Sequence, residues 1–383
     1  MINRRFVALS LAGALSLAAL GFAGWLWSLP PKPPNTAAPP PVAQAETAAM
    51  LAALAPPKRA RPLVAVVGIN DATETTDYVM PYGILKRSGV ADVVALAVAP
   101  GPVTLYPALT VMPDATIADF DRRHPDGADY VIVPAMSRDD DPAVLRWLQA
   151  QAGKGAIVIG VCAGAKVVAA AGLLDGKRAT THWYYLAELL DEHPTITHVK
   201  DRRFVVDGRV ATTTGISASM PMALTLIEAI AGRARAEEVA RELGLASWSA
   251  AHDSAAFVFN RRFATTALGN TVALWRREKI ALPLAPGIDE VALALVADAW
   301  SRTYRSRAVT VADAATPVRT RAGLQIVPDR VESDASHQST LPAPDQLPPA
   351  LALDRALQSI AVRYGERTAE LVAMQMEYPR RAD

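Results

Sequence analysis

The fold is decided by the stretch Ile159-Gly160-Val161-Cys162-Ala163-Gly164-Ala165. An apolar run over residues 156–161 leads into the only cysteine of the chain, and a helical pattern of small residues follows it. Glycines two positions before and after Cys162 permit the tight strand-to-helix turn of a nucleophile elbow. At such a turn the sulfur lies near a helix amino terminus, which favours the thiolate, and the N–H of Ala163 faces a developing oxyanion. The alternative is an inert core cysteine.

The apolar run before Cys162 is one of four such runs, and helical patterns separate them. They cover residues 63–68, 93–99, 129–134 and 156–161. Strands that are apolar throughout are typical of a parallel sheet that is buried on both faces. We therefore predict an α/β fold, a doubly wound (flavodoxin-like) and mostly parallel sheet whose site lies at the carboxyl ends of its strands.

Composition divides the chain into five segments. We predict a membrane anchor or signal peptide (1–29), a Pro/Ala-rich tether (30–61), the α/β domain (62–243), a connecting segment (244–279), and a degenerate second half-repeat with a C-terminal helix (280–383). The half-repeat opens like the α/β domain, and both copies share a Pro-Asp pair, at 113–114 and 328–329. The repeat keeps its two ends and lacks its middle.

The amino terminus predicts a location. Arg4 and Arg5 precede an uncharged, mostly apolar run over residues 6–29, which closes with Trp25 and Trp27. At about 1.5 Å per residue, a helix of this length spans the roughly 30 Å hydrocarbon core of a bilayer. The arginines place the amino terminus in the cytoplasm, so we predict a single-pass membrane protein with an extracytoplasmic folded part, periplasmic in a bacterium. A cleaved signal peptide, and hence a secreted protein, is the alternative.

Charge and cysteine content exclude several classes of protein. Lysine and arginine total 39 against 38 acidic residues, so the chain lacks the basic surplus of a nucleic-acid binder. One cysteine cannot form an intramolecular disulfide, and the six histidines show no metal-ligand spacing. We predict no metal, no cofactor and no nucleic-acid partner, and we expect a small-molecule ligand or substrate.

Three stretches carry a resemblance to a known family. They are GVCAGAKVVAAAGLLDGKRATTHW (160–183), TETTDYVMPYGIL (73–85) and VATTTGISASMPMAL (210–224). Together they resemble the ThiJ/PfpI superfamily, which has the class I glutamine amidotransferase-like fold. The sequence is most similar to the branch with isonitrile hydratases and the sensor domains of AraC-type regulators. The resemblance covers about residues 63–243 and recurs weakly in 280–377, where a regulator would carry its helix-turn-helix domain.

The resemblance implies three catalytic residues: Cys162 as nucleophile, His182, and Asp77, whose carboxyl group hydrogen-bonds the sulfur. A protonated carboxyl can donate to a thiolate, so we expect the pKa of Asp77 to be raised. Glu74 lies one helical turn earlier and is either an additional acid or a capping residue. His182 is either a general base or a helix-start histidine that bonds to backbone.

The sequence departs from the family pattern near the predicted oxyanion site. Where the family often has Gly-Gly, with a backbone N–H facing the cysteine, this chain has Ala135-Met136, so Ala135 is an unusual second donor. No H-x-E motif follows the elbow, so the protein is not a glutamine amidotransferase. Trp183, Tyr184 and Tyr185 follow His182 and either line a small pocket or pack in the core.

These residues leave the function open between an enzyme and a sensor. A cysteine-dependent hydratase, lyase or hydrolase would attack a small electrophile, for which the resemblance implies an isonitrile or a reactive carbonyl. A noncatalytic ligand sensor, or a redox sensor oxidised to sulfenic acid, is the alternative. The resemblance also implies a homodimer, and the half-repeat would then either form that interface or complete the surface of the α/β domain.

Overall fold

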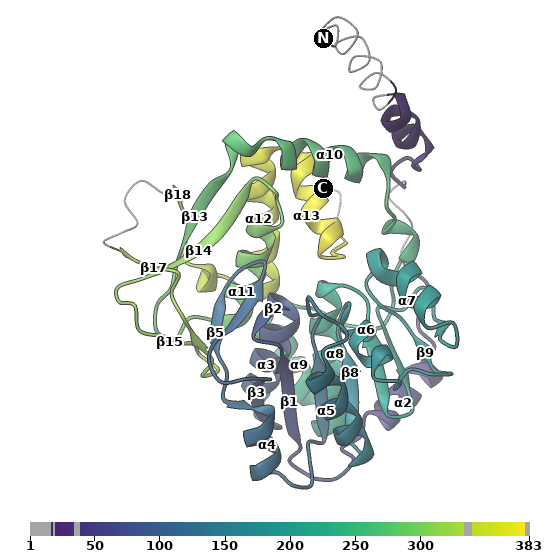
Figure 1. Ribbon diagram of the computed structural model, residues 1–383. Coiled ribbons are helices and arrows are strands. Elements are labelled where there is room, and N and C mark those ends of the chain that lie inside the picture. The colour runs from purple at the N-terminus through teal and green to yellow at the C-terminus, as the bar shows by residue number, and fades with distance from the viewer. Residues whose placement is uncertain (1–16, 18–19, 34–38, 333–338, 380–383) are drawn as a thin grey trace, which may run out of the picture.

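The computed structural model describes residues 17, 20–33, 39–332 and 339–379. Its largest sheet has seven strands in the order β11-β12-β8-β7-β1-β3-β6 (Figure 1). Every neighbouring pair is parallel except the hairpin of β11 and β12. The predicted α/β fold with a mostly parallel sheet is confirmed. The strands are β1 (Leu63–Gly68), β3 (Asp92–Ala97), β6 (Ala115–Thr116), β7 (Tyr130–Val133), β8 (Ile157–Gly160), β11 (Phe204–Asp207) and β12 (Val210–Thr213).

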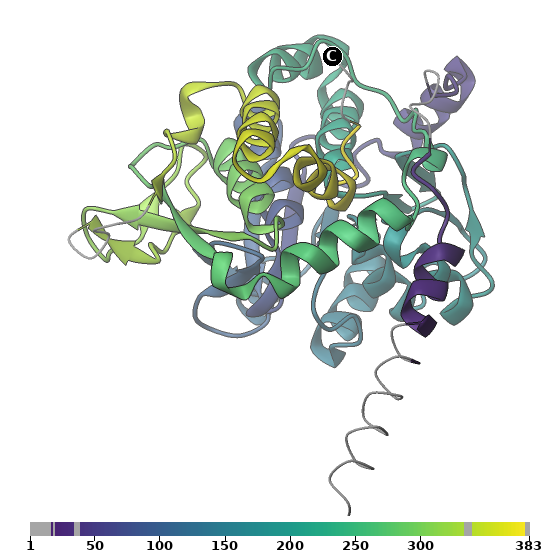
Figure 2. The same cartoon turned by 90° about the horizontal axis from the view of Figure 1, so that it is seen from above.

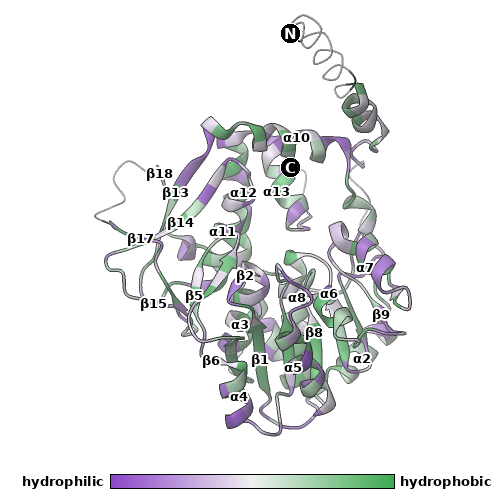
Figure 3. Cartoon of the chain, in the orientation of Figure 1, coloured by the Kyte–Doolittle hydropathy of each residue, from purple (hydrophilic) through white to green (hydrophobic). Residues whose placement is uncertain are grey.

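The apolar strands are buried on both faces, as β1 shows. Val64 and Val66 belong to one hydrophobic cluster, whereas Ala65 and Val67 belong to another on the opposite face. The first cluster includes α3 (Thr75–Ser88), α8 (Ser219–Ala231) and α9 (Arg233–Glu242), and the second includes α4 (Ile117–Arg123), α5 (Pro142–Gly153), α6 (Gly164–Ala170) and α7 (Leu186–Glu192). Figure 3 shows the hydrophobic residues concentrated on the central strands β1 and β8.

A second parallel sheet lies in the C-terminal part, in the order β17-β14-β13-β18. Helix α11 (Glu290–Ser301) connects β13 (Glu278–Pro283) to β14 (Ser306–Ala312), as α3 connects β1 to β3. The short edge strands are β17 (Arg330–Val331) and β18 (Ser339–Thr340). Helices α12 (Pro349–Tyr364) and α13 (Glu366–Gln375) complete this part and share the first hydrophobic cluster.

A third, mixed sheet connects the two parts of the chain. Strand β16 (Gln325–Ile326) of the C-terminal part pairs antiparallel with β5 (Thr110–Met112). The order is β15-β16-β5-β4-β2, with β15 (Val318–Arg319), β4 (Val103–Tyr106) and β2 (Asp71–Glu74) as the remaining strands. Backbone hydrogen bonds therefore join residues that lie more than 200 positions apart in the sequence.

Three of the described helices lie outside the two parallel sheets and the helices that cover them. Helix α2 (Gln44–Ala53) falls within the predicted tether, and its Met50 joins the first hydrophobic cluster. Helix α10 (Arg261–Val272) lies in the predicted connecting segment and runs toward the helix at residues 20–28 (Figure 2). There the side chain of Arg261 donates to the carbonyl oxygens of Leu26 and Trp27 at 3.0 and 2.7 Å. The minor two-stranded sheet consists of β9 (Arg178–Ala179) and β10 (Thr197–His198).

The predicted single-pass membrane location is wrong. In the part of the chain that the structure describes, no helix is long and apolar enough to cross a membrane. Residues 1–16, 18 and 19 of the predicted anchor lie outside the described residues.

Helix α3 packs against α11 at a glycine. A Cβ atom at Gly83 would lie 2.6 Å from Glu290 Oε1 and 2.9 Å from Val291 Cγ2. Both neighbours are fully buried and cannot move aside easily. The absence of a side chain at Gly83 thus sets how closely the two parts of the chain approach each other.

We predict that Gly83→Ala destabilises the protein by about 1–3 kcal/mol, because its methyl group overpacks the contact between α3 and α11. The matched control is Gly269→Ala in α10, where no described atom beyond the adjoining backbone of the helix lies within 4 Å of the new Cβ. That variant should gain up to about 1 kcal/mol from helix propensity. Urea unfolding of both variants measures the difference, and equal stability would contradict the close packing.

Candidate active site

Cys162 lies in the turn between β8 and α6, in a backbone conformation that L residues rarely adopt. Its φ angle is +56°. Close approach requires the glycines on either side: a Cβ at Gly164 would lie 2.0 Å from the carbonyl oxygen of Val133, and one at Gly160 would lie 2.9 Å from Ala165 Cα. The Cys162 N–H donates to Thr213 Oγ1 at 3.0 Å, and its carbonyl oxygen accepts from Thr181 Oγ1 at 2.9 Å. The turn is therefore held from both sides.

The Cys162 side chain is 5% exposed, and its surroundings favour the thiol. Burial raises the pKa of Cys162 well above its ordinary value, and the charges of Asp77 and Glu74 raise it further. The N–H of Ala163 hydrogen-bonds the sulfur and lowers the pKa of Cys162. The charge of Arg302 lowers it as well. We expected a resting thiolate at the amino terminus of α6. This short helix stabilises the thiolate less than burial disfavours it.

Asp77 is fully buried on the first turn of α3. Its Oδ2 accepts a hydrogen bond from the N–H of Ala135 at 3.1 Å, whereas Oδ1 has no hydrogen-bond partner among the described residues. Burial and then the charge of Glu74 raise the pKa of Asp77 well above its ordinary value. Burial and the neighbouring charge thus favour the protonated form of the carboxyl group, and the Ala135 N–H is used by Asp77 in this structure.

Glu74 is the N-cap of α3 and at the same time an ion-pair partner. Its Oε2 accepts from the N–H of Asp77 at 2.6 Å and from Thr76 Oγ1 at 2.8 Å. Its Oε1 accepts from the guanidinium group of Arg302 at 2.7 Å. The capping geometry fixes this carboxylate next to Asp77, so Glu74 belongs to the surroundings of the sulfur.

Arg302 reaches the site from the C-terminal part of the chain, and sequence reasoning missed it. It is the C-cap of α11, and its Nε donates to Asp298 Oδ1 at 2.8 Å while Nη2 donates to Glu74. Burial raises the pKa of Asp298 to about 7 despite this ion pair. One buried arginine therefore lies beside the three carboxyl groups of Glu74, Asp77 and Asp298, and the pKa values of Asp77 and Asp298 are raised.

Both ring nitrogens of His182 hydrogen-bond to backbone groups. Nδ1 accepts from the N–H of Tyr184 at 3.2 Å, which leaves Nε2 as the donor to the carbonyl oxygen of Gln375 at 3.0 Å. Burial lowers the pKa of His182, so the ring is neutral. This is the geometry of a histidine that caps a helix start, since neither nitrogen is left to take a proton from Cys162.

The end of α13 is fixed beside His182 by a buried glutamate that the sequence analysis did not single out. Glu377 Oε2 accepts from the N–H of Gly215 at 2.6 Å, and Oε1 pairs with His252 Nε2 at 2.8 Å. A Cβ at Gly215 would lie 2.4 Å from Glu377 Cβ, so only glycine permits this approach. His252, which had no assigned role, thus helps to fix the C-terminal part on the first.

Comparison with known proteins identifies the part of the chain that carries Cys162. The DJ-1/PfpI family profile matches residues 64–229. The chain contains a DJ-1/PfpI domain. The resemblance to the ThiJ/PfpI superfamily is confirmed, and the match includes Glu74, Asp77, Cys162 and His182, whereas Arg302 and Glu377 lie beyond it.

The relatives include an enzyme and a transcriptional regulator. The chain is 29% identical to the Parkinson disease protein 7 homolog of Danio rerio over 46% of this chain and 93% of that protein. It is 38% identical to the isonitrile hydratase of Pseudomonas putida over 37% and 60%, respectively. It is 35% identical to the HTH-type transcriptional regulator CdhR of Pseudomonas aeruginosa over 27% and 31%. The crystal structure of Drosophila melanogaster DJ-1beta superposes with a TM-score of 0.44 and 23% sequence identity, over 49% of this chain and 100% of that chain.

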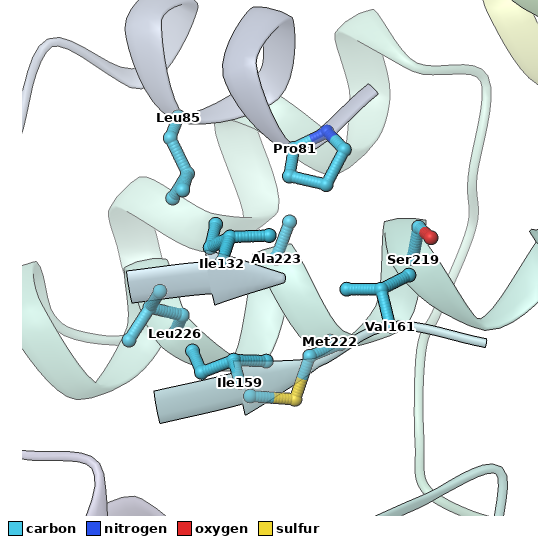
Figure 4. Close-up of a pocket in the computed structure, with 9 residues that line it drawn as sticks. All are labelled: Pro81, Leu85, Ile132, Ile159, Val161, Ser219, Met222, Ala223 and Leu226. Carbon is cyan, nitrogen blue, oxygen red and sulfur yellow. The ribbon is translucent and has the colours of Figure 1, made fainter. Parts of the chain in front are cut away.

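A pocket inside the DJ-1/PfpI domain lies behind the elbow, between the sheet and helices α3 and α8 (Figure 4). The space is about 10 Å³, close to the smallest volume that holds one water molecule. Its lining is apolar except for Ser219, whose hydroxyl has no partner among the described residues. One hydroxyl is too few to hold a water in place, so this pocket is a packing defect and receives no substrate.

The residues that follow His182 in the DJ-1/PfpI domain divide between core and surface. Trp183 Nε1 donates to the carbonyl oxygen of Met374 at 2.8 Å, and its ring packs edge-on against Phe263 at 5.5 Å. Tyr184 and Tyr185 remain partly exposed. In the described part of the chain, no three His, Cys, Asp or Glu side chains are placed to share a metal ion.

We predict that Asp77→Asn moves the titration of the Cys162 thiol to lower pH. Asparagine keeps the acceptor for the Ala135 N–H but cannot ionise, so the negative charge that raises the thiol pKa is removed. Because the chain has one cysteine, the iodoacetamide alkylation rate against pH reports this thiol alone. The exposed Asp313→Asn serves as control and should match the wild type. A shift of Asp77→Asn to higher pH would contradict the assignment.

We predict that Asp298 makes stability fall as pH rises from about 4 to about 7. Its folded pKa of about 7 exceeds the ordinary value of 3.8, so in this range the folded protein holds a proton that the unfolded chain has lost. Asp298→Asn abolishes this difference, and the decline in the free energy of unfolding should become shallower. Urea unfolding at about pH 5 and about pH 8 measures the slope, and a slope as steep as that of the wild type would refute the prediction.

Proposed function

We propose that the DJ-1/PfpI domain uses Cys162 as a nucleophile toward a small organic electrophile, an isonitrile or a reactive carbonyl, without a metal or organic cofactor. The observation that carries the proposal is the buried Asp77 carboxyl group, whose Oδ1 has no hydrogen-bond partner among the described residues and whose pKa is raised well above its ordinary value. A buried acid that keeps its proton at neutral pH is suited to donate it during nucleophilic attack.

For an isonitrile the reaction balances with water as the sole co-reactant. The Cys162 sulfur forms a bond to the terminal carbon, Asp77 gives its proton to that carbon, and the thiol proton passes to the Asp77 carboxylate. The product is a thioimidate on Cys162. Water then adds to its C=N bond, the C–S bond breaks, the nitrogen retains a proton, and the thiol is restored with release of an N-substituted formamide. The N–H of Ala163, which already bonds the sulfur, lies where charge develops.

We further propose that residues 280–383 repeat part of the domain formed by residues 62–243 and pack on it with pseudo-two-fold symmetry. The ion pairs are reciprocal. Arg302 at the end of α11 reaches Glu74 at the start of α3, and Arg87 near the end of α3 reaches Asp289, the N-cap of α11, at 2.8 Å. The face of α3 is then occupied within one chain, so a homodimer would need a different surface.

Noncatalytic ligand sensing is the second candidate, and particular contacts favour it. Both nitrogens of His182 are occupied, and so is the N–H of Ala135, which leaves the site without a free general base or second oxyanion donor. The redox alternative is less well supported, because sulfenic acid formation follows thiolate character and exposure, and the Cys162 thiol is buried with a raised pKa.

The proposal predicts that the wild-type protein converts at least one member of a panel of isonitriles, glyoxals and amides, and that Cys162→Ala abolishes this turnover. Cys162→Ser should retain binding but lose at least about 100-fold in rate, because a hydroxyl group is a weaker nucleophile. Mass spectrometry of the product, the formamide for isonitriles, measures turnover. Identical rates for wild type and Cys162→Ala would exclude catalysis by this cysteine. Ligand-dependent thermal stabilisation without turnover would favour sensing.

A further inference from the structure

Four large aromatic side chains near Cys162 remain open to solvent. They are Tyr106 (57% exposed), Tyr184 (54%), Tyr185 (37%) and Tyr304 (37%), and we call them the tyrosine rim. Many tyrosines elsewhere in the chain, such as Tyr78, Tyr82 and Tyr130, are fully buried. The rim residues come from three separate segments: the end of β4, the 3-10 turn after His182, and the connection between α11 and β14.

The contacts of each segment connect the rim residues to groups that neighbour Cys162. Tyr106 stands opposite Glu74 in the register of β2 and β4. Tyr304 follows Arg302, the partner of Glu74, by two positions and has a left-handed backbone with φ of 58°. The turn that carries Tyr184 and Tyr185 starts beside Thr181, which donates to the Cys162 carbonyl oxygen.

The rim residues also lie close to one another. The rings of Tyr184 and Tyr185 are 5.2 Å apart and nearly perpendicular. The charges of Tyr106 and Tyr184 both raise the pKa of Tyr304, and the charge of Cys162 raises the pKa of Tyr185. Phenol rings from both parts of the chain thus lie close together near Cys162, and their faces and edges provide apolar contact area.

Two cationic side chains beside the rim, Arg302 and Lys166, have partners of opposite charge. Arg302 is bonded to Glu74 and Asp298. Lys166, whose ammonium group lies 5.9 Å from the centre of the Tyr185 ring, pairs with Asp139 and Glu188 at 2.6 Å each. A cationic ligand would meet this ammonium group, and an anionic ligand would meet carboxyl groups that share one arginine. The surroundings favour an uncharged ligand.

We propose that the tyrosine rim selects uncharged molecules that carry an aromatic or other planar group next to the carbon attacked by Cys162. This inference rests on the proposed nucleophilic role of Cys162 and adds a specificity determinant to it. Tyr304 belongs to the part of the chain beyond the match to the DJ-1/PfpI family, so the C-terminal part contributes to substrate choice as well as to the charge balance of the site.

Alkylation of Cys162 tests the rim, because this is the only cysteine in the chain. Four probes share one leaving group: iodoacetamide, N-phenyl iodoacetamide, iodoacetate, and an iodoacetamide that carries a trimethylammonium group. In each case the sulfur displaces iodide, a C–S bond replaces the C–I bond, and the thiol proton passes to the buffer. Intact mass gives the rate at about pH 9, divided by the rate of the same probe with N-acetylcysteine.

The normalised rate for the N-phenyl probe should exceed that for iodoacetamide about tenfold, and both charged probes should be slower than iodoacetamide. Tyr106→Ala and Tyr304→Ala should lower the ratio of the N-phenyl rate to the iodoacetamide rate to about one, whereas Tyr106→Phe and Tyr304→Phe should retain the wild-type ratio. Trp275→Ala, at a site that is 80% exposed in the turn after α10, controls for loss of any surface aromatic group.

The possible failures separate the two proposals. Alkylation by iodoacetamide without a gain for the phenyl probe would overturn the rim and leave the nucleophilic role of Cys162 intact. Retention of the phenyl advantage in both alanine variants would likewise overturn the rim. If no probe modified the native protein while all four modified it in urea, both the rim and the proposed function would be refuted.

Discussion

The structure around Cys162 depends on one buried ion pair, that between Arg302 and Glu74. Among the described residues, Arg302 is the sole cation bonded to the carboxyl groups of Glu74 and Asp298. It belongs to the C-terminal part, whereas Glu74 caps the helix that carries Asp77. Without it, the carboxylates of Glu74 and Asp298 would be buried without compensation, a situation that costs several kcal/mol per charge. The pair therefore holds the two parts of the chain together and keeps a workable charge balance beside the sulfur.

The surroundings of Cys162 and Asp77 favour the protonated form of both side chains over a resting thiolate. Burial raises the pKa of both Cys162 and Asp77, so each holds its proton at rest, and the Ala163 N–H and Arg302 oppose this only in part. Such a site reacts when a bound electrophile accepts electron density from sulfur and a proton from the carboxyl group together. Both ring nitrogens of His182 hydrogen-bond to backbone groups. His182 thereby links the turn after β9 to the end of α13.

The parts of this arrangement that could be predicted from sequence are those encoded by local patterns. The strand runs and the Gly-x-Cys-x-Gly turn depend on residues a few positions apart, and the structure has the parallel sheet and the elbow that they predict. Arg302 and Glu377 meet partners 228 and 162 positions away, so no local pattern points to them. The proposed repeat offers one signal for Arg302, since Arg302 ends α11 much as Lys86 and Arg87 end α3. At the amino terminus, the hydropathy of an apolar run predicted a membrane span, and this prediction is wrong.

The covalent connection between the two parts has a consequence for how the site responds to dilution. When a second subunit supplies a residue to an active site, the fraction of complete sites falls as the protein becomes scarce, because association is bimolecular. Here Arg302 and Tyr304 are carried by the same polypeptide as Cys162, so their arrival is an intramolecular event with a fixed effective concentration. The number of complete sites per molecule is then independent of how many copies of the chain are present, and a single isolated molecule has the whole arrangement.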